Sequence, residues 1–306
     1  MSTIPGKIVR FYTPGAPDVL KMEDMELGPP KAGEVQVEHK AIGLNFIEVY
    51  WRTGVYPQPL PCCPGSEGAG IVRAVGEGVT DLKVGDRVAY GSGPVGSYAT
   101  VRNMPAHPLV KIPDSIDFET AAAMMLKGFT AQYLLRRVYK VQAGETILFH
   151  AAAGGVGSIV TQWAKSLGVR VIGTVSTREK AELARANGCA EVIITSEENI
   201  VDRVKELTDG KGVPVVYDSV GKATFLDSLN CLKPRGMMVS FGNASGKVDP
   251  VPLQWLAERG SLVLTRPTVA SFTVDKAEML ESAAEMFGVV ASGAVKIQIN
   301  QRFALA

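Results

Sequence analysis

The hydrophobic residues between Thr146 and Gly168 change their spacing once, which indicates a strand followed by a helix. Ile147–Phe149 form a short continuous apolar run, as in a buried strand. After a turn, hydrophobic residues recur at the i, i+3, i+4 and i+7 positions of one helix face: Val156, Ile159, Val160, Trp163, Ala164 and Leu167. Gly168 is expected to end this helix.

The same alternation of strand and helix continues along the chain. Further strands are predicted at 169–175, 190–194, 213–217, 237–241 and 261–265, and helical patterns lie around 179–186, 199–207, 223–232 and 253–259. Strands that alternate with helices predict an α/β fold with a parallel, doubly wound sheet. A ligand is expected at the carboxyl ends of its strands.

The first 125 residues have shorter periods and many Gly and Pro residues. Alternating apolar and polar residues predict strands at 35–41, 69–75 and 86–90, separated by glycine turns. This part is predicted to be mostly β. A helix resumes near 118–135, and a domain boundary is expected along it.

The turn between the first strand and helix reads Ala152-x-Gly154-x-x-Gly157, a dinucleotide fingerprint with Ala in place of the first glycine. Gly154 would let the backbone approach a pyrophosphate, and Gly157 would let the helix pack against the strand. The free N–H groups of the helix N-terminus would face the anion. A glycine turn of this kind can also be only a tight structural turn, and the surrounding alternation favours the cofactor interpretation.

Composition excludes several classes of protein. Of 306 residues, 46% are hydrophobic and 21% are charged, which is ordinary for a globular enzyme. The net charge of +1 does not indicate nucleic-acid binding. We find no signal peptide and no apolar stretch of about 20 residues, so we expect a cytoplasmic protein without a membrane partner. Cys62, Cys63, Cys189 and Cys231 fit neither a disulfide framework nor a zinc pattern, and ordinary reduced thiols are favoured over a redox role for the vicinal pair.

Several segments resemble the medium-chain dehydrogenase/reductase superfamily, and within it the zinc-free quinone oxidoreductases that include zeta-crystallin. The segments are Ala41–Tyr50 with Arg52 and Tyr56, Pro64–Gly70, Val84–Val88 and, above all, Gly144–Lys165. The resemblance implies a GroES-like catalytic domain at 1–125, completed by 267–306, and a Rossmann dinucleotide-binding domain at 126–266. It also implies a homodimer, which an exposed last strand at 261–265 favours. The family continues through another helix and strand beyond residue 306, so a truncated chain is one expectation.

The positions that hold the catalytic zinc ligands Cys and His in related alcohol dehydrogenases look to be Asn45 and Ser66 here. Neither side chain can act as a thiolate or imidazole ligand, and Glu67 alone does not make a metal site. His39, His107 and His150 are expected to be structural. We therefore expect no metal, and the expected reaction is hydride or electron transfer from NADPH to an electron-poor acceptor such as a quinone.

Two other functions stay open. One is reduction of an enone or alkenal, which needs the same hydride geometry. The other is a crystallin-like structural protein that binds the cofactor and turns over little.

The resemblance supplies the candidate catalytic residues. Asn45, Tyr50 and Tyr56 would orient the acceptor or donate hydrogen bonds to its oxygen, although the same loop could be only a packed structural one. Lys127 and Thr130 match family positions near the nicotinamide. A lysine at a helix end is usually solvated, so the role of Lys127 rests mainly on the resemblance.

The expected cofactor is NADPH rather than NADH, because no Asp or Glu ends the second strand to accept bonds from the adenosine ribose. Ser176, Thr177, Arg178 and Lys180 stand there instead, and their alternative role is an ordinary helix N-terminus. Thr195 replaces a tyrosine of close family members, so a stacking contact with the adenosine is expected to be lost. The full cofactor set is Ala153, Gly154, Gly155, Val156, Gly157, Gly173, Ser176, Thr177, Lys180, Thr195, Ser219, Phe241, Gly242, Asn243 and Arg266.

Overall fold

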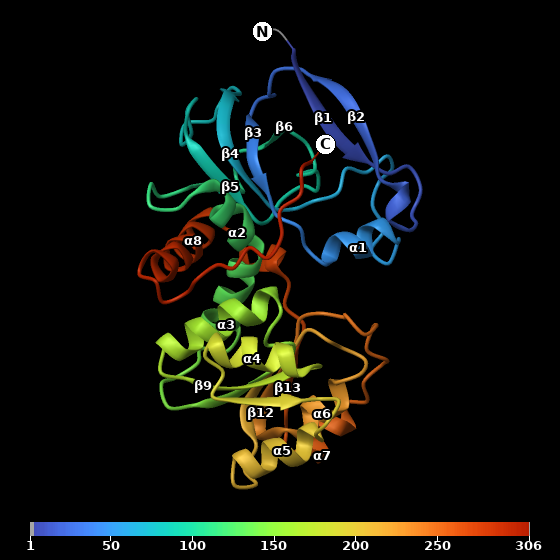
Figure 1. Cartoon of the computed structure of the whole chain (residues 1–306), viewed down its shortest axis with the longest axis vertical. Coiled ribbons are helices and arrows are strands. Elements are labelled where there is room, and N and C mark those ends of the chain that lie inside the picture. Colours follow the sequence, from blue (N-terminus) through green and yellow to red (C-terminus); the bar gives the residue numbers. More distant parts are fainter. Residues whose placement is uncertain (1–2, 306) are drawn as a thin grey trace. The chain divides into compact units, whose positions relative to one another are not determined.

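A computed structural model describes residues 3–305 of the chain (Figure 1). Met1, Ser2 and Ala306, which the predicted first domain includes, lie outside the described residues. The chain divides into two compact units. Unit 1 takes residues up to 129 together with 272–291 and the residues from 297 on, and unit 2 takes 130–271 and 292–296.

Unit 1 is built on antiparallel strands. A five-stranded sheet has the order β6-β3-β4-β5-β7, and a separate hairpin pairs β1 with β2. The strands are β1 (Ile4–Arg10), β2 (Lys21–Leu27), β3 (Glu34–Ile42), β4 (Gly68–Val75), β5 (Arg87–Tyr90), β6 (Val101–Pro105) and β7 (Val110–Lys111). Its core is an apolar cluster between these strands, with Val35, Val37, Val72, Val88 and Tyr90 fully buried.

The helices of unit 1 are few. They are α1 (Ile47–Arg52), most of α2 (Phe118–Tyr133) and α8 (Lys276–Ala291), with a short 3-10 turn at Pro17–Val19. The division between the units falls within α2, between residues 129 and 130. Ala121, Ala122, Met125 and Phe129 of α2 are all buried, as is Leu134 directly after it.

Unit 2 holds a six-stranded parallel sheet in the order β10-β9-β8-β11-β12-β13. Its strands are β8 (Thr146–Phe149), β9 (Arg170–Val175), β10 (Glu191–Ile194), β11 (Val213–Asp218), β12 (Leu232–Ser240) and β13 (Val263–Thr265). Numbered within the sheet, this is the order 3-2-1-4-5-6, so the strand order reverses between β8 and β11. The fold class predicted from the sequence, a doubly wound parallel sheet plus a mostly β domain, is confirmed.

Helices cover both faces of this sheet (Figure 1). They are α3 (Gly155–Ser166), α4 (Arg178–Ala186), α5 (Ile200–Leu207), α6 (Phe225–Asn230) and α7 (Gln254–Glu258), with a π-helical segment at Leu134–Val138 and a 3-10 turn at Val269–Phe272. Figure 1 shows α3 and α4 on one face and α5 and α6 on the other. Leu148 of β8, Ile172 of β9 and Ile193 of β10 form one apolar cluster with residues of α5 and α6. Within residues 3–305, no helix is long and apolar enough to cross a membrane.

Some elements were not predicted. The hairpin β1–β2 and the six-residue helix α1 have no long period to mark them. Helix α8 does carry a signal, because Met279, Ala283, Met286 and Phe287 are buried at helical spacing. Strand β12 begins five residues before its predicted start, since its first half contains Pro234, and Arg235 has a positive φ of 62°.

Candidate functional site

The turn between β8 and α3 is shaped by two glycines with different surroundings. A Cβ at Gly157 would lie 2.5 Å from the carbonyl oxygen of Ala151 and 2.6 Å from that of Ala152, so only glycine lets α3 begin this close to the turn. Gly154, the N-cap of α3, has φ −76° and ψ 175°, which any residue adopts. Its only close neighbour would be the Ala151 oxygen, at 3.1 Å. Gly154 is therefore not required by the packing of the turn, and its open outer face suits a ligand that approaches the backbone.

The donors at this turn suit an anion. Because the first N–H groups of an α-helix have no partner inside the helix, those of Gly155, Val156 and Gly157 point outward along the axis of α3. The cap residue carries no side chain that would compete for them. Ala153 is half-buried beside them, and Gly154 and Gly155 are exposed. The predicted phosphate-binding residues therefore come together, at the point where the strand order reverses.

A buried polar network lies directly behind this turn. The imidazole of His150 contacts the Thr174 hydroxyl at 2.9 Å and the Ser228 hydroxyl at 2.9 Å, and Ser228 donates to Asp218 Oδ2 at 2.8 Å. His150, Ser228 and Asp218 are fully buried, and burial lowers the pKa of His150. The network joins the ends of β8, β9 and β11, which fixes the strands that carry the turn. Sequence reasoning left His150 as a structural histidine and missed its partners.

The predicted cofactor residues Ser219, Phe241, Gly242, Asn243 and Arg266 lie at the ends of the next strands. Ala244 donates from its backbone to Ser219, and a Cβ at Gly242 would lie 2.4 Å from the Ser219 oxygen, so these two loops are in contact. The ring of Phe241 packs against Phe149 at 5.7 Å. Arg266 follows β13 and donates to the carbonyl oxygen of Ser240 at 2.8 Å. Asn243 lies in the loop after β12, and its backbone oxygen accepts a bond from Gly246.

The predicted adenosine-side residues gather where β9 and β10 end. Thr177 is the N-cap of α4, and its side chain accepts a hydrogen bond from the Lys180 N–H. This is the ordinary helix N-terminus that was the alternative to a cofactor role. The ammonium of Lys180 donates to the Ser176 hydroxyl at 3.3 Å, and the Thr195 hydroxyl donates to the Val175 oxygen at 3.2 Å. Gly173 lies buried within β9. The cap and a cationic side chain are thus both present at the same turn.

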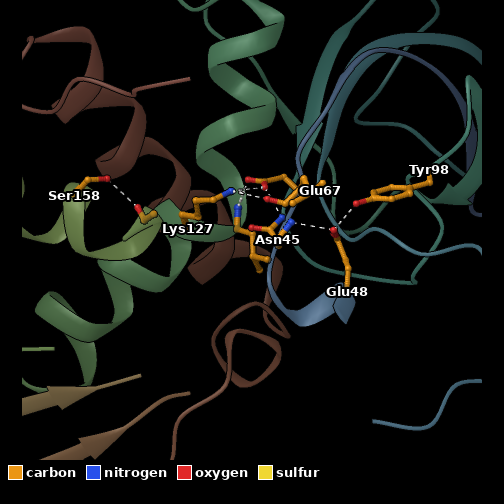
Figure 2. Close-up of polar contacts among 9 residues, drawn as sticks. Asn45, Glu48, Glu67, Tyr98, Lys127 and Ser158 are labelled. Carbon is orange, nitrogen blue, oxygen red and sulfur yellow. Dashed lines mark hydrogen bonds and ion pairs between the residues drawn. The ribbon is translucent and has the colours of Figure 1, made fainter. Parts of the chain in front are cut away.

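In unit 1, three groups converge on the carboxylate of Glu67, which is fully buried (Figure 2). The Asn45 amide donates to Oε2 at 2.7 Å, the Leu126 N–H donates to Oε1 at 2.8 Å, and Lys127 Nζ lies 3.2 Å from Oε2. Lys127 lies inside α2 rather than at a helix end, and its side chain is only 22% exposed. The alternative role, a solvated lysine at a helix end, does not describe this position, because the buried carboxylate of Glu67 holds the ammonium.

Glu48 lies on the other side of Asn45 (Figure 2). Its Oε2 accepts bonds from the Asn45 N–H at 2.9 Å and from the Tyr98 hydroxyl at 2.6 Å. Its Oε1 is buried and has no hydrogen-bond partner among the described residues. Burial raises the pKa of Glu48 to about 7. The sequence contained a signal for this contact, since Asn45-x-x-Glu48 has the spacing of a capping box.

The remaining candidate catalytic residues are an aromatic pair and a threonine. Tyr50 packs edge-on against Tyr56 at 5.1 Å between ring centres and against Phe46 at 5.3 Å. Phe46 is 59% exposed, so this aromatic cluster reaches the surface of unit 1. Thr130 is buried on α2, and its hydroxyl bonds to Tyr133.

The carboxylates of this site do not form a cluster that could hold a metal ion in the described part of the chain. Among residues 3–305, no three His, Cys, Asp or Glu side chains are grouped to hold a metal ion. The hydroxyl of Ser66 is buried and has no hydrogen-bond partner in the described part of the chain. Burial raises the pKa of the thiols of Cys62 and Cys63, which disfavours the reactive thiolate form.

Comparisons with known proteins agree with this arrangement. The model of the alcohol dehydrogenase GroES-like domain matches residues 31–114, and that of the zinc-binding dehydrogenase matches residues 155–288. The chain is 56% identical over 301 residues to a quinone oxidoreductase of Pseudomonas aeruginosa, covering 98% of this chain and 93% of the relative. The chain belongs to the quinone oxidoreductase family. The family resemblance drawn from the sequence is confirmed.

Two other relatives bear on the chemistry. The structure of Escherichia coli quinone oxidoreductase complexed with NADPH superposes with a TM-score of 0.94 at 48% identity, covering 96% of this chain and 90% of that one. A 2-haloacrylate reductase of Burkholderia is 44% identical over 303 residues, covering 96% of this chain and 91% of the relative.

The raised pKa of Glu48 makes folding stability depend on pH. The unfolded pKa is near 4.5 and the folded one about 7, so the folded chain binds this proton more tightly. The resulting stability is fully present below pH 4.5 and is lost as the pH rises through 7, by about 3 kcal/mol in all. Urea unfolding from pH 4.5 to 8 should show this fall as the difference in unfolding free energy between the parent and Glu48→Gln, because the opposite contributions of buried His39 and His150 are common to both proteins. The exposed Glu77→Gln variant is the control and should follow the parent. An identical pH profile for parent and Glu48→Gln would contradict the assignment.

Proposed function

We propose that this chain is an NADPH-dependent quinone oxidoreductase that needs no metal. The observation that carries the proposal is the turn at Gly154, whose open outer face and outward N–H groups lie where the strand order of the parallel sheet reverses. The donors at this turn fit a pyrophosphate, because they are backbone N–H groups at a helix N-terminus and the first turn of α3 carries no acidic side chain. The NADPH complex of the Escherichia coli relative supports the same cofactor.

Several residues would hold the cofactor. Ala153, Gly154, Gly155, Val156 and Gly157 would bind its phosphates. Gly173, Ser176, Thr177, Lys180 and Thr195 would surround the adenosine, and Ser219, Phe241, Gly242, Asn243 and Arg266 would lie along the nicotinamide half. NADPH, when bound, supplies the hydride. The protein's own contribution is to orient the acceptor and to stabilise the charge that develops on its oxygen.

Asn45 and Lys127 are the best-placed groups for that contribution in unit 1. One N–H of the Asn45 amide is bound to Glu67, which fixes the plane of the amide and leaves its second N–H for an acceptor oxygen. Glu67 also anchors the ammonium of Lys127, which would supply positive charge. Tyr50 and Tyr56 would bound the acceptor with aromatic surface, and Thr130 would contact the nicotinamide side. A quinone suits such a site because it is already electron-poor and needs no Lewis acid.

The function is tested by NADPH oxidation, followed at 340 nm, with and without 1,2-naphthoquinone, on protein dialysed against a chelator and checked for metals by elemental analysis. We expect quinone-dependent oxidation that survives the dialysis. Stoichiometric zinc, or activity that zinc alone restores, would refute metal independence. NADPH binding without quinone-dependent turnover would favour a crystallin-like binding protein.

Reduction of an enone is the second candidate, and the 44% identical 2-haloacrylate reductase favours it. It requires the same hydride donor and a polarised carbonyl. A panel of quinones and enones at matched concentrations discriminates the two functions by their kcat/KM.

The preference for NADPH is assigned to Lys180, whose ammonium lies at the turn after β9 beside Ser176. A charge-assisted hydrogen bond contributes about 1.5–3 kcal/mol, so Lys180→Ala should weaken NADPH binding about 10- to 150-fold and leave NADH binding nearly unchanged. Calorimetric titration of both cofactors into parent and variant measures this. An equal loss of affinity for NADH and NADPH in the variant would mean that Lys180 does not bind the 2′-phosphate.

The assembly is proposed to be a homodimer, and the reducing cytoplasm to be its compartment. Strand β13 is an edge of the six-stranded sheet, and its Val263 is 45% exposed. An unpaired edge of this kind favours pairing with a second copy about a two-fold axis. We also propose the two domains in the form that the sequence suggested, 1–125 with 267–306, and 126–266.

Light scattering at micromolar concentration should give twice the mass of the 32.6 kDa chain. Val263→Lys places a charge on the edge strand and should shift the population toward monomer. A monomer mass for the parent would contradict the dimer.

A further inference from the structure

The turn that is assigned to the 2′-phosphate already contains an anion of its own. Arg178, the first residue of α4, donates from Nε to Glu197 Oε1 at 2.8 Å and from Nη2 to Oε2 at 3.2 Å. Glu197 follows β10, the neighbour of β9 in the sheet. The Ser196 hydroxyl also donates to the Ser176 oxygen at 3.2 Å, so the two strand ends are tied together here. The carboxylate thus occupies the guanidinium in the two-point geometry that a phosphate also uses.

The charges around the turn balance in this state. Arg178 and Lys180 are the cations, and Glu179 and Glu197 are the acids. Glu179 is engaged by a hydrogen bond with Thr177, which lowers its pKa, and Glu197 by the hydrogen bonds from Arg178, which lower its own. The 2′-phosphate therefore meets a turn without net charge, and Arg178 is available to bind it only when the pair with Glu197 opens.

We infer that Arg178 exchanges Glu197 for the 2′-phosphate of NADPH, so that Glu197 is an internal competitor that sets how strongly the chain prefers NADPH over NADH. The inference rests on the proposed function. The side chains of Arg178 and Glu197 are 79% and 40% exposed. An ion pair this exposed contributes little, and a phosphate dianion offers Arg178 more charge than one carboxylate. The Thr195 hydroxyl does not compete with the phosphate for Arg178, because it donates to the backbone oxygen of Val175.

The exchange makes the two residues act in opposite directions. Removing Glu197 frees Arg178 and should tighten binding of a 2′-phosphate. Removing Arg178 should weaken that binding. The gain from removing Glu197 should disappear when Arg178 is absent, because a competitor matters only while its target is present. Simple repulsion between Glu197 and phosphate would persist without Arg178.

The test is calorimetric binding of 2′,5′-ADP and of 5′-AMP, two fragments that differ in the 2′-phosphate and need no turnover. The parent should bind 2′,5′-ADP more tightly. Glu197→Gln should tighten 2′,5′-ADP about 2- to 5-fold, and Arg178→Ala should weaken it about 10-fold or more, with 5′-AMP nearly unchanged in both. The double variant should bind 2′,5′-ADP as Arg178→Ala does. Glu206→Gln, which removes the same charge from an exposed ion pair with Arg203 on α5, should match the parent.

Three results would overturn the exchange. They are no change or weaker 2′,5′-ADP binding in Glu197→Gln, no loss in Arg178→Ala, and a gain from Glu197→Gln that persists in the double variant. Equal affinity of the parent for the two fragments would instead defeat the proposed NADPH specificity, and the exchange with it. Thermal melting of each variant checks that these surface substitutions leave the fold intact.

Discussion

The close approach of helix α3 to the end of strand β8 is the constraint on which the cofactor site depends. Only a glycine at position 157 allows it, because any Cβ there would meet two backbone oxygens within 2.6 Å. The approach directs the first N–H groups of α3 outward past Gly154. Behind the turn, His150, Ser228 and Asp218 join three strand ends through buried hydrogen bonds. The anion site is therefore made of backbone that packing holds in place, and it needs little rearrangement to bind.

In unit 1, the arrangement of the candidate catalytic side chains depends on one buried charge. The carboxylate of Glu67 is fully buried, and an unpaired charge there would cost several kcal/mol. Lys127, the Asn45 amide and the Leu126 N–H satisfy it instead. Two candidate catalytic side chains are thus fixed by one carboxylate. The sequence resemblance matches Asn45 and Ser66 to the metal-ligand positions of related alcohol dehydrogenases; Asn45 lies in this polar cluster, and Ser66 is buried.

The sequence predicted much of the fold, because the Rossmann strands and helices have regular periods and the glycine spacing marks one turn. It predicted which residues gather at that turn for the same reason. The contacts of Glu67 and the bond from Tyr98 to Glu48 were out of reach, since they join residues far apart in the chain, such as Asn45 with Glu67. The sequence placed Arg178 at the end of the second strand, and only the structure shows that Glu197 accepts its hydrogen bonds. Side-chain pairing across loops depends on tertiary geometry, which no period in the sequence encodes.

The most direct test of this account is the NADPH affinity and melting temperature of Gly154→Val. Position 154 has a backbone conformation open to any residue and one near neighbour at 3.1 Å, so the variant should fold. Its side chain would cover the outward N–H groups of α3. We predict a melting temperature within a few degrees of the parent's and NADPH binding weakened at least about 100-fold, as expected when several charge-assisted hydrogen bonds are blocked. A folded variant that binds NADPH as tightly as the parent would contradict the assignment of this turn as the pyrophosphate site.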